Sequence, residues 1–417
     1  MLVRERPVGA AYRAPSLLRG SGLLLLASLA TTATNYGFQI MLGRSMGPDE
    51  FGRWSAAFSL VALTGMVGVA LQTAVARTEA TRPVANLPVR PFAQVVRDPV
   101  LARVLFASCA LATAILVTGP VLARWLGLDA AVVAGIALLM PGTALCSVAF
   151  GLLQGSRRFR ALAVMNAVLA TGKLAAGAAA LAIGLGSAPI LLALGALALV
   201  TALGAIHWGA RRPLDDPRLL LQDTGRAVVA LGTVALVAVI DVPLARYWLD
   251  PTAAGRYAAA ATAARSVLFV PAVIASVALP ELARRGRGSD RRERGVLVRA
   301  AILTVVGALL GCGALAVLAP VVLPPLLGTT YDASSPLVWQ LGLASVPFAA
   351  AGLLVQFLLA RSGAWWLVLL PLAPAAQIVW LIFVNDRPTD VMWSCVVAST
   401  VLLVVSAFAT VRECRRP

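Results

Sequence analysis

The chain has 417 residues, of which 60% are hydrophobic and only 13% are charged. Soluble globular proteins are nearer half apolar and a quarter charged, so this composition excludes an ordinary soluble domain. The net charge is +17, but the basic residues stand in short segments between apolar runs, which indicates membrane topology rather than nucleic-acid binding. We therefore expect an all-α polytopic membrane protein with no nucleic-acid partner.

Twelve apolar runs follow one another along the chain. Each is about 20 residues long, which lets a helix cross a hydrocarbon core of about 30 Å. The alternating pattern of an outer-membrane barrel is absent. The predicted transmembrane helices cover 20–43, 53–75, 100–122, 130–154, 160–183, 187–208, 226–248, 255–282, 297–320, 335–360, 363–384 and 389–411.

Arginine is distributed unevenly between the two sets of loops that these helices would create. The loops after the second, fourth, sixth and eighth runs are rich in arginine, for example at 157–160 and 284–294, and so are both tails. The other loops hold few, several of them beside Asp or Glu. Because cytoplasmic loops carry the excess of basic residues, both termini are predicted to be cytoplasmic.

A pattern in the first half of the chain recurs about 200 residues later. Residues 42–44 (LGR) and 52–57 (GRWSAA) match residues 244–246 (LAR) and 255–260 (GRYAAA). Each pair of motifs lies at the turn between the first two helices of its half. Chance similarity in a sequence rich in Ala, Gly and Arg is the alternative explanation.

A repeat of this kind divides the protein into two lobes. Six helices per half preserve the orientation, so the halves would be related by a pseudo-two-fold axis along the membrane normal. The predicted lobes are 1–210, with the first six helices, and 211–417, with the other six. Two such lobes would enclose a central cavity, which suits a transporter better than a membrane anchor.

Motifs for soluble catalysis are missing from the sequence. There is no phosphate-binding G-x-x-x-x-G-K-[ST] loop, no H-E-x-x-H and no G-x-S-x-G. These absences argue against nucleotide hydrolysis by a phosphate loop, metalloprotease chemistry and serine hydrolysis. The five cysteines lack metal-ligand spacing. We expect no enzymatic activity, no cofactor and no metal.

Three ionisable residues lie inside predicted helices at similar depth: Lys173, Asp241 and Arg265. A charge at mid-bilayer costs at least a few kcal/mol, so such residues usually face a cavity or a partner. Asp241 and Arg265 stand on consecutive antiparallel helices and can form a structural ion pair or a coupling site. Alternatively, Arg265 and Lys173 give the cavity a positive lining for an anionic headgroup.

Two further features could shape that cavity. Asn35 and Gln39 share one face of the first helix, where they either line the cavity or bond to neighbouring helices. Prolines stand inside several predicted helices, where they act as hinges or as static kinks. They are Pro141, Pro243, Pro271, Pro347, Pro371 and Pro374.

Several segments resemble one family of transporters. Residues 41–54 (MLGRSMGPDEFGRW) resemble the first outer turn of Wzx-type polysaccharide flippases, in the MOP (multidrug/oligosaccharidyl-lipid/polysaccharide) superfamily. Residues 151–159 (GLLQGSRRF) are similar to that family's turn between helices 4 and 5, and residues 241–260 to its helix 7–8 hairpin. Met46 stands where the family usually has leucine. The chain is short for the family, so it should lack the extra helices of MurJ-type flippases.

The resemblance implies a MATE-like pair of six-helix lobes around a cationic cavity in the bacterial cytoplasmic membrane. The implied activity is alternating-access flipping of a polyprenyl-pyrophosphate-linked oligosaccharide from the inner to the outer leaflet, alongside polysaccharide assembly proteins. Lys173 and Arg265 are the implied partners of the pyrophosphate. Arg44 would help at the outer mouth or anchor the turn. Membrane potential or an ion gradient would drive transport.

Two other functions fit the sequence. A cation-coupled multidrug exporter of the same superfamily would need intramembrane carboxylates for a cationic drug, and here it rests mainly on Asp241. A non-transporting scaffold of envelope polysaccharide assembly would explain the sparsity of polar residues in many helices. Glycosyltransferase genes beside this one would favour the flippase.

Overall fold

The computed structural model describes residues 14–80, 98–209, 217–274, 290–359 and 364–415, and all regular structure in these ranges is helical. Side chains are not described for 14–29, 208–209, 217–224 and 290–294. The α-helices are α1 (Ala14–Ser45), α2 (Pro48–Ala80), α4 (Pro99–Leu126), α5 (Ala130–Gly155), α6 (Phe159–Ala182), α7 (Ser187–Gly209), α8 (Pro217–Val239), α9 (Asp241–Trp248), α10 (Pro251–Ala264), α12 (Asp290–Leu327), α13 (Ser335–Leu359), α14 (Leu372–Phe383) and α15 (Pro388–Cys414). Three short 3₁₀ helices are η1 (Arg265–Leu268), η2 (Thr329–Ser334) and η3 (Trp365–Val368).

The length and composition of these helices confirm the predicted all-α membrane fold. Among the described residues, ten helices are long and apolar enough to cross a membrane, or eleven if the bent pair α8–α9 counts as one span. α1 has 32 residues, which at about 1.5 Å per residue also exceeds the bilayer core. Each of the twelve predicted runs lies on one of these helices, although 275–282, 360 and 363 fall outside the described residues.

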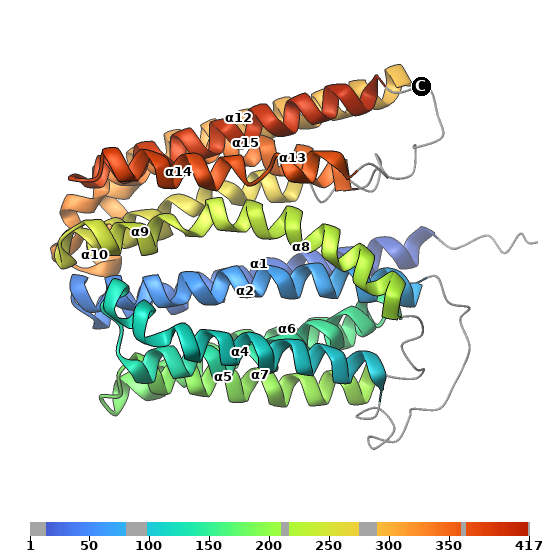
Figure 1. The fold of residues 1–417 in the computed structure, drawn as a ribbon, viewed down its shortest axis with the longest axis horizontal. Helices are drawn as coiled ribbons and strands as arrows, with labels where there is room; N and C mark the ends of the chain where they lie inside the picture. The colour runs from blue at the N-terminus through green and yellow to red at the C-terminus, as the bar shows by residue number, and fades with distance from the viewer. Residues whose placement is uncertain (1–13, 81–97, 210–216, 275–289, 360–363, 416–417) are drawn as a thin grey trace, which may run out of the picture.

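The helices run roughly side by side along the long axis of the molecule in two bundles (Figure 1). α5 packs against α2, α4 and α7 on one side, and α13 packs against α12 and α15 on the other. Between these bundles, α2 packs against α8, α9 and α10. This is the expected two-lobed arrangement. The predicted boundary between residues 210 and 211 lies outside the described residues.

Prolines coincide with the breaks in the second half. A proline lacks an N–H and clashes with the carbonyl four residues earlier. Pro243 therefore fits the end of α8 at Val239, where the chain bends by 41° into α9. η1 lies before Pro271 and η3 before Pro371 in the same way.

Pro141 and Pro347 lie inside their helices and do not end them. α5 and α13 continue through these residues without a break. Both helices are packed along much of their length, with half or more of their apolar windows buried. Neighbouring helices hold a proline-containing span together in a membrane, so the local defect does not end it.

The two ends of the molecule are formed by different turns and loops. One end holds the α1–α2 turn, the end of α4, the α9–α10 turn and η2. We call this the outer end, because the sequence predicts that the arginine-rich loops at the other end are cytoplasmic. The opposite end is called the inner end. The arginine-rich segments 82–97 and 284–289 and the N-terminal tail lie outside the described residues, so the orientation stays a prediction.

Candidate functional site

Two arginines of the sequence repeat join the halves at the outer end. Arg44, in the last turn of α1, donates from Nη1 to the carbonyl of Pro325 in α12 at 2.6 Å. Arg246, in the last turn of α9, donates from Nε to the carbonyl of Leu126 at the end of α4, at 3.2 Å. The last carbonyls of a helix lack intrahelical partners and carry partial negative charge. Each arginine therefore caps a helix of the opposite half.

An ion-pair cluster strengthens this contact. Asp49, in the first turn of α2, lies 2.7 Å from Nη1 of Arg246 and 2.7 Å from Nη2 of Arg53. The Arg246 side chain is only 9% exposed, whereas that of Asp49 is 42% exposed. Tyr331 in η2 adds a hydrogen bond from its hydroxyl to the carbonyl of Met46 at 3.2 Å. The outer ends of the two halves are thus held together.

The glycines of the repeat meet at the same place. A Cβ added to Gly255 in α10 would lie 1.7 Å from the carbonyl oxygen of Pro48, and one added to Gly52 in α2 would lie 3.0 Å from the Cα of Gly255. Only residues without a side chain allow the two backbones to approach so closely. The repeated glycine therefore has a physical reason: it forms the crossing of α2 and α10.

Asp241 and Arg265 form the ion pair that their positions on antiparallel helices predict. Nη2 of Arg265 lies 2.8 Å from Oδ1 of Asp241, and the hydroxyl of Tyr257 donates to Oδ2 at 3.1 Å. Asp241 is the first residue of α9, so the helix N-terminus also favours its negative charge. Its side chain is 6% exposed and that of Arg265 is 30% exposed.

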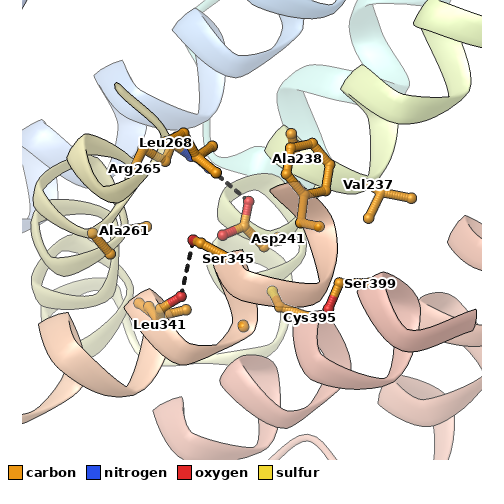
Figure 2. Close-up of a pocket in the computed structure, with 13 residues that line it drawn as sticks. Val237, Ala238, Asp241, Ala261, Arg265, Leu268, Leu341, Ser345, Cys395 and Ser399 are labelled. Carbon is orange, nitrogen blue, oxygen red and sulfur yellow. Dashed lines mark hydrogen bonds and ion pairs between the residues drawn. The ribbon is translucent and has the colours of Figure 1, made fainter. Parts of the chain in front are cut away.

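A small pocket surrounds this pair. Figure 2 shows Arg265 facing Asp241, with Ser345 of α13 and Cys395 and Ser399 of α15 nearby. Its volume is about 50 Å³, which is room for a water or a small ion and not for a sugar headgroup.

Lys173 occupies a separate site in the first half. Its ammonium donates to Oδ1 of Asn35 at 2.8 Å. It also lies 4.7 Å from the ring centroid of Phe38 and 4.8 Å from that of Phe58, within the range of cation–π attraction. Among the described residues, no ion pair joins Lys173 to a carboxylate. Its positive charge is held in place but not neutralised.

The predicted site residues therefore fall into three places. Lys173 and Asn35 are together in the first half, and Gln39 accepts a bond from Nε1 of Trp54 at 3.4 Å nearby. Asn35 and Gln39 thus bond to neighbouring helices, one of the two alternatives expected for them. Arg265 and Asp241 share the pocket of Figure 2, which Lys173 does not line. Arg44 anchors the outer turn.

α1 contacts Lys173 and also the residue that follows η1. Asn35 bonds to Lys173, and the ring of the next residue, Tyr36, packs against that of Phe269 in a tilted arrangement with centroids 5.3 Å apart. Phe269 directly follows η1, which begins with Arg265. Movement of α1 would therefore change the contact of Asn35 with Lys173 and that of Tyr36 with Phe269.

Reasoning from the sequence did not assign roles to Asp49, Arg246 or Tyr257. The repeat contained the signal for Arg246, because it stands where Arg44 stands in the first half. No sequence pattern pointed to Asp49 as its partner, since the two residues are 197 positions apart. Tyr257 also belongs to the repeat, opposite Trp54, but its hydroxyl is unique to the second half.

Comparisons with known proteins identify the fold. No protein-family model matches the sequence, and no curated protein matches it. The structure is similar to an inward-facing multidrug resistance MATE transporter of the MOP superfamily, with a TM-score of 0.68 and 16% identity over 92% of this chain and 94% of that one. It is similar to the lipid II flippase MurJ in an inward closed conformation, with a TM-score of 0.72 and 10% identity over 93% and 87%.

A eukaryotic MATE transporter, AtDTX14, gives a TM-score of 0.65 and 15% identity over 95% of this chain and 98% of that one. These likenesses do not single out the Wzx-type family that the sequence motifs resemble. The chain has the fold shared by MATE transporters of the MOP superfamily and the MurJ flippase.

Proposed function

We propose that this protein is a transporter that flips a polyprenyl-pyrophosphate-linked oligosaccharide from the inner to the outer leaflet. Lys173 is the observation that carries the proposal, because its ammonium is seated among Asn35, Phe38 and Phe58 without a described carboxylate partner. An uncompensated cation within a membrane helix is costly, and binding an anion offsets that cost. An anionic headgroup therefore suits this site better than a cationic drug.

Arg265 has a different part in this proposal. Asp241 neutralises it in this conformation, so it becomes available to a second phosphate only when that pair separates. A proton or another cation on Asp241 would release Arg265, which would couple an ion gradient to substrate binding. Asp241 would thus act as an ion-pair partner in one stage of the transport cycle and as the coupling group in another.

The closed outer end supports alternating access. Arg44, Arg246 and Tyr331 bind across the halves there, and these bonds hold the two halves together at that end. Flipping requires these contacts to break while the inner end closes. We also propose that the protein lies in a bacterial cytoplasmic membrane with both termini cytoplasmic, works with polysaccharide assembly proteins, and divides into lobes 1–210 and 211–417.

Reconstituted transport tests the proposal. Purified protein in vesicles should expose a labelled polyprenyl-pyrophosphate oligosaccharide to an enzyme added outside, and Lys173→Met should abolish this while Lys173→Arg retains part of it. Arg124→Gln, an exposed arginine at the outer end of α4, serves as a control. Full transport by Lys173→Met at normal protein levels would refute the role of Lys173.

A cation-coupled multidrug exporter is the second candidate, and the buried Asp241 is the observation that favours it. That function predicts efflux of a cationic dye that depends on an ion gradient and is lost in Asp241→Asn, with no movement of lipid-linked sugar. A protein that moves neither substrate, yet whose deletion disrupts polysaccharide assembly, would be the scaffold.

A further inference from the structure

An apolar groove lies between α2 and α4 in the first half. Both helices face α5, and residues of all three line a cavity of about 240 Å³. Its walls include Val67, Val104 and Leu111. We call it the α2–α4 groove. Lys173 and Asp241 do not line it, so it is separate from the sites described above.

The hydroxyl groups in the groove are already satisfied. Thr64 donates to the carbonyl of Val61 at 2.8 Å, Ser108 to that of Leu105 at 2.9 Å, and Ser147 to that of Thr143 at 2.9 Å. Each bond stays within its own helix. The groove therefore offers an entering molecule a hydrocarbon-like surface with little need for polar contacts.

One charge stands at the inner end of the groove. Arg103 is the sole charged residue in its lining, one turn after α4 begins at Pro99. It is exposed, at the depth where lipid headgroups of the predicted cytoplasmic leaflet lie. From Arg103 to Leu111 the helix rises about 12 Å, close to the thickness of one leaflet's hydrocarbon. The groove is thus one leaflet deep, with a cation at headgroup level.

In the second half, α12 packs closely against the segment that follows η1. There, a Cβ added to Gly307 of α12 would lie 2.7 Å from Cγ1 of Val270 and 3.6 Å from Cδ1 of Ile274. The 3₁₀ segment η1 packs against α12. In the first half α2 is continuous, and nothing lies within 4 Å of a Cβ added to Gly65, which lines the groove. Among the described residues, the groove between α2 and α4 is therefore open where α12 and the segment after η1 pack closely.

We propose that the α2–α4 groove binds one anionic phospholipid of the cytoplasmic leaflet. One acyl chain lies along the groove, and the phosphate contacts the guanidinium of Arg103. Charge complementarity selects an anionic headgroup, because basic side chains at this depth attract anionic lipids of the inner leaflet. The bound chain fills the space between α2 and α4 and so stabilises the packing of α4, which otherwise rests on α5 and α9.

Three variants probe the groove with purified protein in detergent. Gly65→Leu and Ala107→Phe fill it, and Arg103→Gln removes its charge. Two controls match them: Gly313→Leu adds a leucine on exposed α12 where nothing lies within 4 Å, and Arg124→Gln removes an exposed arginine at the outer end of the same α4. The probes are phosphatidylglycerol and phosphatidylcholine, measured as bound lipid by native mass spectrometry and as a shift of Tm.

The wild type and both controls should retain one phosphatidylglycerol and gain thermal stability from it. The filling variants should bind that lipid with an affinity about tenfold lower or worse. Arg103→Gln should lower the affinity for phosphatidylglycerol about fivefold and that for the zwitterionic phosphatidylcholine less. Ala107 is exposed, so Ala107→Phe should fold and tests the groove even if Gly65→Leu fails to fold. Unchanged lipid binding in Ala107→Phe and Arg103→Gln would overturn the proposal. Displacement of phosphatidylglycerol by equimolar polyprenyl phosphate would also overturn it and assign the groove to the substrate's chain.

Discussion

Arg44 and Arg246 hold equivalent positions in the two halves of the chain, and each caps a helix of the other half. Arg44 bonds to the carbonyl of Pro325 and Arg246 to that of Leu126. A hydrogen bond to a charged group contributes about 1.5–3 kcal/mol. Arg246 is only 9% exposed, whereas Arg44 is exposed to solvent, so the Arg44 bond contributes less, about 1 kcal/mol or below. These contacts together stay below the roughly 5.5 kcal/mol that moves a two-state equilibrium from 1:99 to 99:1, so substrate binding can counterbalance them.

Removing Arg246 should open the outer end. Arg246→Ala loses the bonds to Leu126 and Asp49 together, so the population should shift towards outward-open states. Spin labels on the exposed positions Ser45 and Thr252 should report a longer distance by pulsed electron resonance. Arg44→Ala should have a smaller effect because it loses one bond. Arg124→Ala is the control, and an unchanged distance distribution in Arg246→Ala would contradict the closure.

The crossing of α2 and α10 should not tolerate a side chain. Gly255→Ala places a methyl group 1.7 Å from the carbonyl oxygen of Pro48, so the helices must separate, at a cost of about 1–3 kcal/mol. Gly52→Ala should be milder, since its nearest atom is 3.0 Å away. Gly232→Ala in α8, with nothing within 4 Å, is the matched control. Equal Tm values for the Gly255 and Gly232 variants would show that the crossing is not tight.

Breaking the pair of Asp241 and Arg265 should destabilise the second half. Asp241→Asn leaves Arg265 without its counter-charge, and since the arginine is 30% exposed we expect a loss of about 1–3 kcal/mol, below the range for a fully buried pair. The double variant Asp241→Asn/Arg265→Gln should recover much of it, as a double-mutant cycle measured by thermal unfolding would show.

The same double variant also tests coupling. If Asp241 couples an ion gradient to transport, the double variant should be folded but should transport at a rate independent of that gradient. Transport that still follows the gradient would leave the pair with a structural role alone.

Lys173 should show opposite effects on stability and on binding. Lys173→Met replaces the ammonium with an apolar chain between Phe38 and Phe58, which should leave Tm unchanged or raise it. Binding of a polyprenyl pyrophosphate, measured by fluorescence titration, should fall about tenfold, the equivalent of one hydrogen bond to a charged group. A variant that loses stability while binding normally would identify Lys173 as structural.

Local patterns predicted one site contact well. Asp241 and Arg265 are 24 residues apart on adjacent antiparallel helices, so their depths alone made the pair foreseeable. Lys173 and Asn35 are 138 residues apart, and each had several candidate neighbours. The sequence predicted the depth of each residue in the membrane. It did not predict which helices are neighbours.

By itself, the sequence determined the helical spans, because a bilayer cannot hydrogen-bond to the backbone and every apolar run of sufficient length must become a helix. It also carried the repeat, and with it the expectation of two like halves. Only the tertiary structure decided that Arg44 reaches Pro325, 281 residues away, and that Gly52 lies against Gly255. Within the membrane every helix is apolar, so hydrophobicity does not specify partners. Packing of small residues and a few polar bonds do, and these depend on the whole fold.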